Sequence, residues 1–307
     1  MYKNKSKINT YTFGLFLIAL ISFAIYSCRV DNTVQKDVIR IKGSDTMLNL
    51  SLMWAEKFMQ ENSRTSIQVS GGGSETGLAA LLNGSVKVAN ISRSLTGNEI
   101  QTALKKGVEP VANMVAEDAI VIAVHIANKI DSLTVAELKK IYSGHIKNWK
   151  EVGGDNKRII LYGREKSSGT YEIFRNSILN EAADSSFIDY YAGMKVLQGT
   201  AAIAEAVAND KFGIGFGGMG YFASRKDVKV LSIKINNITK AVSPLKFTSL
   251  YGHPIHPNNY PLSRKLYCYT NGKPQGDVKK FIDFIVSSNG QKIVEQMEFI
   301  PLTFSGE

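Results

Sequence analysis

The sequence is poor in the residues on which disulfide-bonded proteins and many catalytic sites depend. Its 307 residues include two cysteines, Cys28 and Cys268, and four histidines. Two cysteines exclude a disulfide framework, and Cys268 stands in the apolar run LYCYT, where we expect it to pack in a core. No run of basic residues with interleaved aromatic residues is present, so nucleic acid is not an expected partner.

The N-terminus has the composition of an export signal. Three lysines in MYKNKSKINT precede the apolar segment YTFGLFLIALISFAIYSC, which is too short and one-sided to predict a membrane span. Ile25, three positions before Cys28, gives a loose form of the bacterial lipoprotein signal-peptidase motif, in which Tyr26 is unusual. We predict a signal peptide over 1–27, a lipidated Cys28 and a tether over 28–37. The protein would then be an exported lipoprotein, anchored to a membrane and facing the periplasm or the cell exterior.

Net charge and chain length give further information on the class of protein and its domain organisation. Without the three lysines of the signal, the formal net charge falls from +10 to about +7, which is typical of a solvated surface. About 280 residues remain, which exceeds one ordinary core and indicates two lobes. There is no low-complexity linker and no internal repeat, so we expect the lobes to be joined by short crossing segments.

One strand-to-helix turn has an unusual composition. The apolar run KRIILY predicts a buried strand, GREKSSGT follows it, and Tyr171, Phe174 and Ile178 then recur at helical spacing. The first N–H groups of a helix lack partners and carry the positive end of its dipole. Hydroxyls, a glycine and Arg164 at that position therefore form a pocket for an anion. The alternative is an ordinary Ser/Thr helix cap beside a surface arginine.

Two further turns have the same composition. VIRIKG predicts a strand that leads through Ser-Asp-Thr into a helix, and SIQVS leads through GGGSETG into the helical segment LAALLNG. Three such junctions favour a ligand over three independent caps. The segments 96–99 (TGNE) and 134–137 (TVAE) instead fit plain capping boxes and need no ligand. The alternation of strands and helices predicts α/β layers with mainly parallel sheets.

These motifs resemble a known family. The segments GSDTM, GGGSETG, ISRSL, IYSGHIKNWKEVGG, GREKSSGT, GIGFGGMGY, YPLSRKLY and FIDFIVSSNGQKIVEQMEFIPL are similar to the phosphate-binding protein of the bacterial high-affinity phosphate ABC transporter, a periplasmic binding protein. The resemblance implies two α/β lobes, joined by two or three crossing strands, that close around an anion held in the cleft between them. It places lobe 1 at 38–115, lobe 2 at 116–245 and a return to lobe 1 at 246–307.

The resemblance also implies ligand contacts. Arg164 is implied to pair with phosphate, while the serine, glycine and threonine after it donate hydroxyl and backbone hydrogen bonds. The implied ligand-binding residues, all in the three turns and the ISRSL stretch, are Ser44, Asp45, Thr46, Ser74, Ser92, Arg93, Arg164, Ser168, Gly169 and Thr170. One departure is clear: where enteric members have an aspartate after Ser92, this chain has Arg93.

This departure raises the question of how phosphate is distinguished from sulfate. Phosphate still carries a proton at neutral pH, which a carboxylate can accept, whereas sulfate would meet an unpaired like charge. Our hypothesis is that Asp45 is this carboxylate, while Arg93 steadies it or adds a second cationic contact. The alternative is that Asp45 caps the helix that begins near Met47.

The predicted function is to bind inorganic phosphate and deliver it to the permease and ATPase subunits of an ABC transporter, as a monomer. Two alternatives keep the fold. The ligand could be another tetrahedral oxyanion such as sulfate or molybdate, since hydroxyls, N–H groups and one arginine suit all of them. The protein could also be a phosphate-sensing lipoprotein.

An enzyme is not expected. A serine nucleophile needs a nearby base, and the histidines available are His125, His145, His253 and His256. GGGSETG has Thr76 where a nucleophile elbow needs glycine, and no GxxxxGK[ST] phosphate loop is present. The pair in GHPIHP has no nearby carboxylate or cysteine to complete a metal site. We therefore predict no catalytic residue, no metal and no cofactor.

Overall fold

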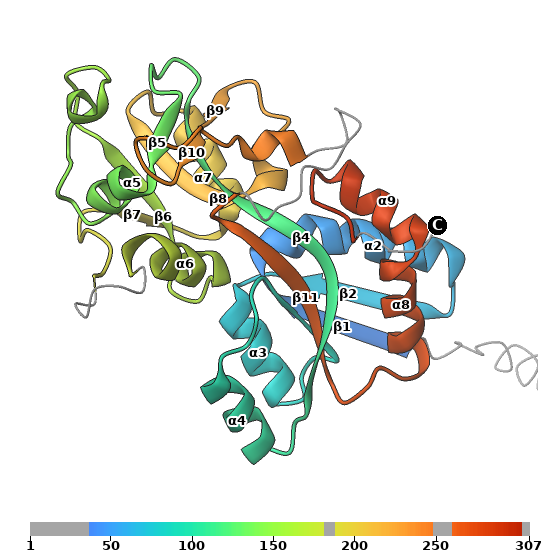
Figure 1. Ribbon diagram of the computed structural model, residues 1–307. Coiled ribbons are helices and arrows are strands. Elements are labelled where there is room, and N and C mark those ends of the chain that lie inside the picture. Colours follow the sequence, from blue (N-terminus) through green and yellow to red (C-terminus); the bar gives the residue numbers. More distant parts are fainter. Residues whose placement is uncertain (1–36, 181–187, 248–259, 303–307) are drawn as a thin grey trace, which may run out of the picture. The chain divides into compact units, whose positions relative to one another are not determined.

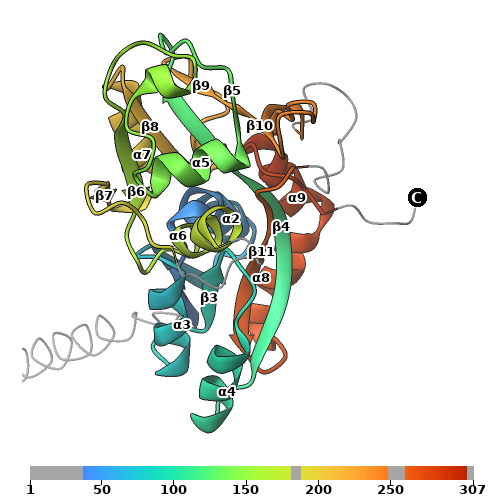
Figure 2. The same cartoon turned by 60° about the vertical axis from the view of Figure 1, so that its left-hand side comes forward.

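Two antiparallel strands, β4 (Pro110–His125) and β11 (Ser263–Asn271), run side by side through the middle of the fold (Figure 1). Residues 110–119 of β4 pair with β11, whereas residues 120–125 pair with strands of the other half of the fold. Strand β4 therefore belongs to both halves. Figure 2 shows it extending from β9 at one end to α4 at the other.

The computed structural model describes residues 37–180, 188–247 and 260–302. We call the half that contains the first strands lobe 1. Its elements, besides part of β4 and β11, are β1 (Asp37–Gly43), η1 (Asp45–Met47), α2 (Leu48–Glu61), β2 (Thr65–Ser70), α3 (Ser74–Leu82), β3 (Val88–Ile91), α4 (Gly97–Lys105), α8 (Gly276–Val286) and α9 (Ser288–Gln296).

We call the other half lobe 2. Its elements, besides the end of β4, are β5 (Ser132–Thr134), α5 (Val135–Tyr142), η2 (Trp149–Val152), β6 (Ile160–Arg164), α6 (Gly169–Phe174), η3 (Arg175–Leu179), β7 (Lys195–Leu197), α7 (Gly199–Ala208), β8 (Gly213–Gly218), η4 (Met219–Tyr221), β9 (Val228–Val230), β10 (Ser232–Lys234) and η5 (Pro244–Phe247).

The main sheet is mixed rather than mainly parallel. Its order is β2-β1-β3-β11-β4-β8-β6-β7, with β9 paired to β4, and β5 pairs with β10 in a separate two-stranded sheet. β1 runs parallel to β2 and β3, and β6 runs parallel to β7 and β8. β4 and β11 are antiparallel to each other and to their outer neighbours. The reason is topological: β4 leaves lobe 1 and β11 returns to it, so the two strands run in opposite directions.

Each lobe has its own apolar packing. In lobe 1, one cluster includes Trp54 on α2 and Phe281 on α8, and a second one lies under α3 and α4. In lobe 2, the rings of Phe174 and Phe216 stack with centroids 4.0 Å apart. Cys268, 1% exposed, packs in the lobe 1 core as predicted.

The two plain capping boxes are confirmed. Thr96 accepts a hydrogen bond from the N–H of Glu99, and Thr134 accepts one from Glu137, while each glutamate side chain bonds back to the backbone N–H of its threonine. The expected signal peptide, tether and lipidated Cys28 lie outside the described residues. Within the described ranges, no helix is both long and apolar enough to cross a membrane.

Candidate functional site

The three glycine- and hydroxyl-rich turns meet at one buried place where lobe 1 contacts lobe 2. Thr46 Oγ1 of lobe 1 lies 3.0 Å from Thr170 Oγ1 of lobe 2, and Ser74 Oγ lies 3.3 Å from Ser92 Oγ. The hydroxyl residues gathered here are each no more than 3% exposed: Ser44, Thr46, Ser74, Ser92, Ser168 and Thr170. The structure therefore brings together residues that are far apart in the sequence, as the turn composition suggested.

Glycines allow the main chains of the two lobes to approach closely. A Cβ on Gly169 would lie 2.5 Å from Ser74 Oγ and 2.8 Å from Ser92 Oγ. Gly73, whose φ is +91°, would place a Cβ 2.4 Å from the carbonyl oxygen of Ser167. That same carbonyl accepts the backbone N–H of Glu75 at 3.2 Å, which is a direct main-chain bond between the lobes.

The helix starts differ in how they are capped. Ser168 Oγ accepts the N–H groups of Thr170 and Tyr171 at the start of α6, so this serine does act as a helix cap. Its hydroxyl hydrogen remains available to donate, because a hydroxyl has one donor and two acceptor lone pairs. Ser44 and Gly73, which precede η1 and α3, provide no side-chain cap.

Arg164 is buried, 1% exposed, and held by two carboxylates. Its Nε and Nη2 donate to Glu165 at 3.0 and 2.8 Å, and Nη2 also donates to Asp45 Oδ2 at 2.9 Å. Its Nη1 donates to Thr200 Oγ1 at 2.8 Å. The alternative interpretation of Arg164 as a surface residue is therefore wrong.

Asp45 does not cap the helix that follows it. No side-chain cap hydrogen bond forms at the start of η1 or α2. Instead Asp45 Oδ1 accepts the N–H of Gly72 at 2.9 Å, while Oδ2 pairs with Arg164 of the other lobe. The capping alternative is wrong because a buried arginine offers this carboxylate a charged donor, and charge-assisted hydrogen bonds are the stronger ones.

A second buried arginine, Arg264, was not among the predicted site residues. Its Nε and Nη2 donate to Asp118 Oδ2 at 2.9 and 2.7 Å, its Nη1 donates to Thr170 Oγ1 at 2.8 Å, and its Nη2 donates to Thr46 Oγ1 at 3.1 Å. Burial raises the pKa of Asp118 above its ordinary value, although Arg264 opposes that shift. The segment YPLSRKLY contains Arg264, but no local feature of that segment indicates a role at the site.

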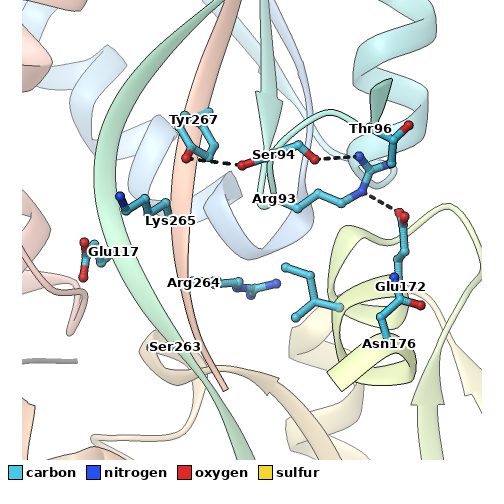
Figure 3. A pocket seen from close by; sticks show the side chains of 11 residues that line it. Arg93, Ser94, Thr96, Glu117, Glu172, Asn176, Ser263, Arg264, Lys265 and Tyr267 are labelled. Atoms are coloured by element: carbon cyan, nitrogen blue, oxygen red, sulfur yellow. Dashed lines mark hydrogen bonds and ion pairs between the residues drawn. The ribbon is translucent and has the colours of Figure 1, made fainter. Parts of the chain in front are cut away.

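Arg93 pairs with carboxylates from both lobes. Its Nη1 and Nη2 donate to Glu99 at 2.8 and 2.7 Å, and its Nε lies 2.5 Å from Glu172 Oε2, in an ion pair whose N–H is not aligned for a hydrogen bond. One of the dashed lines in Figure 3, the one between Arg93 and Glu172, marks this contact. The expectation that Arg93 steadies Asp45 is therefore wrong, whereas the alternative of a second cationic contact with the anion stays a prediction.

A cleft of about 470 Å³ opens beside the buried hydroxyls. Residues from β4, β11, α6 and the loop after β3 line it, and Arg93 and Arg264 both border it (Figure 3). Arg264 therefore connects the cleft to Thr46 and Thr170, because it lines the cleft and donates to both hydroxyls.

The two histidines that the structure describes lie away from the turns. His125 accepts the N–H of Ala127, and His145 contacts the hydroxyl of Ser143, so neither hydrogen-bonds to a serine of the turns. No group of three or more His, Cys, Asp or Glu side chains suited to a metal ion occurs among the described residues. His253 and His256 lie outside them.

The sequence is similar to a family model and to characterised proteins. A model of the PBP superfamily domain matches residues 30–289. The phosphate-binding protein PstS of Pseudomonas aeruginosa is 31% identical over 277 residues, which covers 85% of this chain and 81% of that protein. PstS of Borreliella burgdorferi is 30% identical over 291 residues, which covers 93% of this chain and 97% of that protein.

Solved structures share the fold. A protein from Clostridium perfringens, described as a phosphate ABC transporter substrate-binding protein with bound phosphate, aligns with a TM-score of 0.73 and 26% identity. An ABC-type phosphate transport receptor from Vibrio cholerae aligns with a TM-score of 0.66 and 28% identity. Both alignments cover 87% of this chain and 100% of the other. The predicted two-lobed α/β fold is confirmed.

The ion pair between Arg93 and Glu99 gives a pH-dependent stability. Burial alone would raise the pKa of Glu99, but the hydrogen bonds from Arg93 and Thr96 outweigh it and lower the pKa below the ordinary 4.5. This stabilisation is fully present above pH 4.5 and is lost as the pH falls through the lower pKa of the folded state. Glu99→Gln keeps the capping geometry but removes the charge, so we expect it to lower the free energy of unfolding at pH 7 by about 1 to 2 kcal/mol.

Thermal and urea unfolding at pH 7 and below pH 4 would measure this difference. Glu137→Gln is the matched control, because Glu137 occupies the same position of a capping box and has no ion pair among the described residues. Equal losses for the two variants at pH 7 would contradict a contribution from Arg93.

Proposed function

We propose that this chain, which belongs to the PBP superfamily and to its phosphate-binding proteins of bacterial ABC transporters, binds inorganic phosphate between its two lobes. The observation that carries the proposal is the meeting of the three turns, which contribute hydroxyl groups from both lobes within one buried place. As a substrate-binding protein it is not an enzyme. We further propose that it delivers phosphate to the permease and ATPase subunits of a transporter.

The ligand contacts are proposed from this geometry. The hydroxyls of Thr46, Ser74 and Ser92 would donate from lobe 1, and those of Ser168 and Thr170 from lobe 2. Gly169 would bring its backbone N–H close to the anion, since it has no side chain to keep the turns apart. Each donor is buried, and the two lobes must separate enough for the anion to replace the contact between the hydroxyls of Thr46 and Thr170.

The lobe boundaries are also a proposal. Lobe 1 would comprise 38–115 and 246–307, and lobe 2 would comprise 116–245. The pairing of β4 with β11 and the separate apolar clusters support a division near these bounds, although Tyr260, Leu262 and Ile300 pack in the lobe 2 cluster and Ala116 in the lobe 1 cluster. Contacts such as Thr46 with Thr170 connect the lobes, and we propose that phosphate takes their place when it binds between the lobes.

The N-terminal sequence supports export as a lipoprotein. We propose that Cys28 carries the lipid, that the protein is anchored to a membrane and that it works as a monomer. Labelling with a radioactive fatty acid in cells, compared with Cys28→Ser, would test the anchor.

Calorimetry on soluble protein that begins near residue 31 tests the function. We expect one phosphate to bind per chain with a Kd in the micromolar range or tighter, about −8 kcal/mol or better. Sulfate and molybdate, at the same concentrations, are the comparison ligands. If sulfate or molybdate bound more tightly, that anion rather than phosphate would be the ligand. Absence of heat with all three anions would contradict the proposal.

Arg164 is expected to contribute strongly to binding. Arg164→Ala should weaken phosphate binding by about 2 to 5 kcal/mol, as is typical when one member of a buried charged pair is removed. Arg164→Lys should recover only part of the loss, because a single ammonium group cannot reproduce the contacts of the guanidinium group with Glu165, Asp45 and Thr200.

The control for this comparison is Arg225→Ala in the same lobe, which removes an arginine paired with Glu205 and Asp227 at the surface. It should bind phosphate like the parent. Circular dichroism and thermal unfolding would show that each variant is folded. Parent-like affinity in both Arg164 variants would exclude a role for this residue in binding.

Asp45 is proposed to accept the proton of phosphate. Its carboxylate belongs to the turn that contains Thr46, and Asp45→Asn keeps an oxygen for the N–H of Gly72. Since sulfate has no proton to share, this variant should lose much of the preference for phosphate. The ratio of the phosphate and sulfate affinities between pH 6 and 8 measures this preference, and an unchanged ratio would refute the role of Asp45.

A further inference from the structure

Resting on the proposed phosphate site, we propose that Arg264 and Asp118 are positioning residues that fix the hydroxyl groups of Thr46 and Thr170 as hydrogen-bond donors to the anion. Arg264 and Asp118 lie opposite each other in the antiparallel register of β11 and β4. These are the two strands that run through the middle of the fold, so the pair reaches one hydroxyl from each lobe.

The carboxylate of Asp118 fixes the orientation of the guanidinium group. Its Oδ2 accepts both Nε and Nη2 of Arg264, and its Oδ1 accepts the backbone N–H of Met219 at 3.0 Å. Asp118 is fully buried and Arg264 is 7% exposed. Gly218 leaves room for this arrangement, since a Cβ there would lie 2.6 Å from Thr46 Cγ2 and 2.9 Å from Asp118 Oδ2.

The direction of the hydrogen bonds follows from the chemistry of the groups. A guanidinium group donates only, whereas a hydroxyl has one hydrogen and two lone pairs. Because Arg264 donates to Thr170 and to Thr46, both hydroxyl oxygens accept hydrogen bonds from the guanidinium group. The hydrogen of each hydroxyl must therefore point away from Arg264. One hydroxyl donates to the other across 3.0 Å, which leaves the second hydrogen unused by this trio.

An anion that separates the two hydroxyls can therefore receive a hydrogen from each. The hydroxyls are also polarised by the charged donor behind them, since hydrogen bonds in a chain strengthen one another. Arg264 thus acts on the ligand through the two threonines. If Arg264 only stabilised the fold, its replacement would change the affinity for phosphate equally with and without the hydroxyls of Thr46 and Thr170.

A double-mutant cycle on the full soluble chain separates these roles. The first variant, Arg264→Gln with Asp118→Asn, replaces a buried ion pair by a neutral pair and leaves no unpaired buried charge. The second, Thr46→Val with Thr170→Val, removes both hydroxyls. The third combines all four changes. Isothermal titration with inorganic phosphate gives the Kd of each.

We expect the neutral pair to weaken phosphate binding about tenfold or more in the parent, as for a lost hydrogen bond to a charged group. In the background without the hydroxyls, we expect the same change to weaken binding by no more than about twofold, within the limits of additivity. Arg225→Gln with Asp227→Asn, which neutralises a surface pair of lobe 2, is the matched control and should leave Kd unchanged.

The inference would be overturned if the combined variant lost affinity by the product of the losses in the two separate variants, or if the Arg264→Gln, Asp118→Asn variant bound phosphate like the parent. Neither result would affect the proposed function. Absence of phosphate binding by the parent would instead overturn the proposed function. If the neutral pair does not fold by circular dichroism, Arg264→Lys replaces it in the same cycle. A single ammonium nitrogen cannot serve Asp118 and both hydroxyls, so this variant should also weaken binding only where the threonines are present.

Discussion

The pairing of β4 with β11 is the constraint on which the rest of the structure depends. The two strands run in opposite directions through the middle of the fold, and their register sets Arg264 opposite Asp118. This register also determines how the turns of one lobe meet those of the other, because each lobe is built outward from these strands. A shift of one residue would move Arg264 to the opposite face of the sheet and remove its contacts with Thr46 and Thr170.

The charges near the hydroxyls nearly compensate one another. Two buried arginines, Arg164 and Arg264, are paired with three carboxylates: Asp45, Glu165 and Asp118. The formal sum of these five groups is about −1 when all are ionised. Attraction of an anion to this place therefore depends on the direction of individual N–H and O–H groups rather than on a net positive charge, which favours selection by geometry.

The sequence was informative wherever the signal was local. The strand-to-helix turns, the helix that includes Phe174, and both capping boxes could be predicted because each depends on residues a few positions apart. Arg264 could not be predicted, since its partner Asp118 is 146 positions away and only the strand register brings them together. The cap interpretation of Asp45 failed for the same reason, because Arg164, which binds its carboxylate, lies 119 positions further along the chain.

The contact of Gly73 with Ser167 limits how near the two lobes can come. It is made by main-chain atoms, and the N–H of Glu75 bonds to the same carbonyl group. Side chains can change rotamer to adjust a contact, but a peptide group held in a turn has little freedom to yield. The smallest separation between the lobes is thus limited by non-bonded contact between main-chain atoms of Gly73 and Ser167. A ligand too large for that spacing would have to hold the halves apart and would lose the hydrogen bond between Glu75 and Ser167.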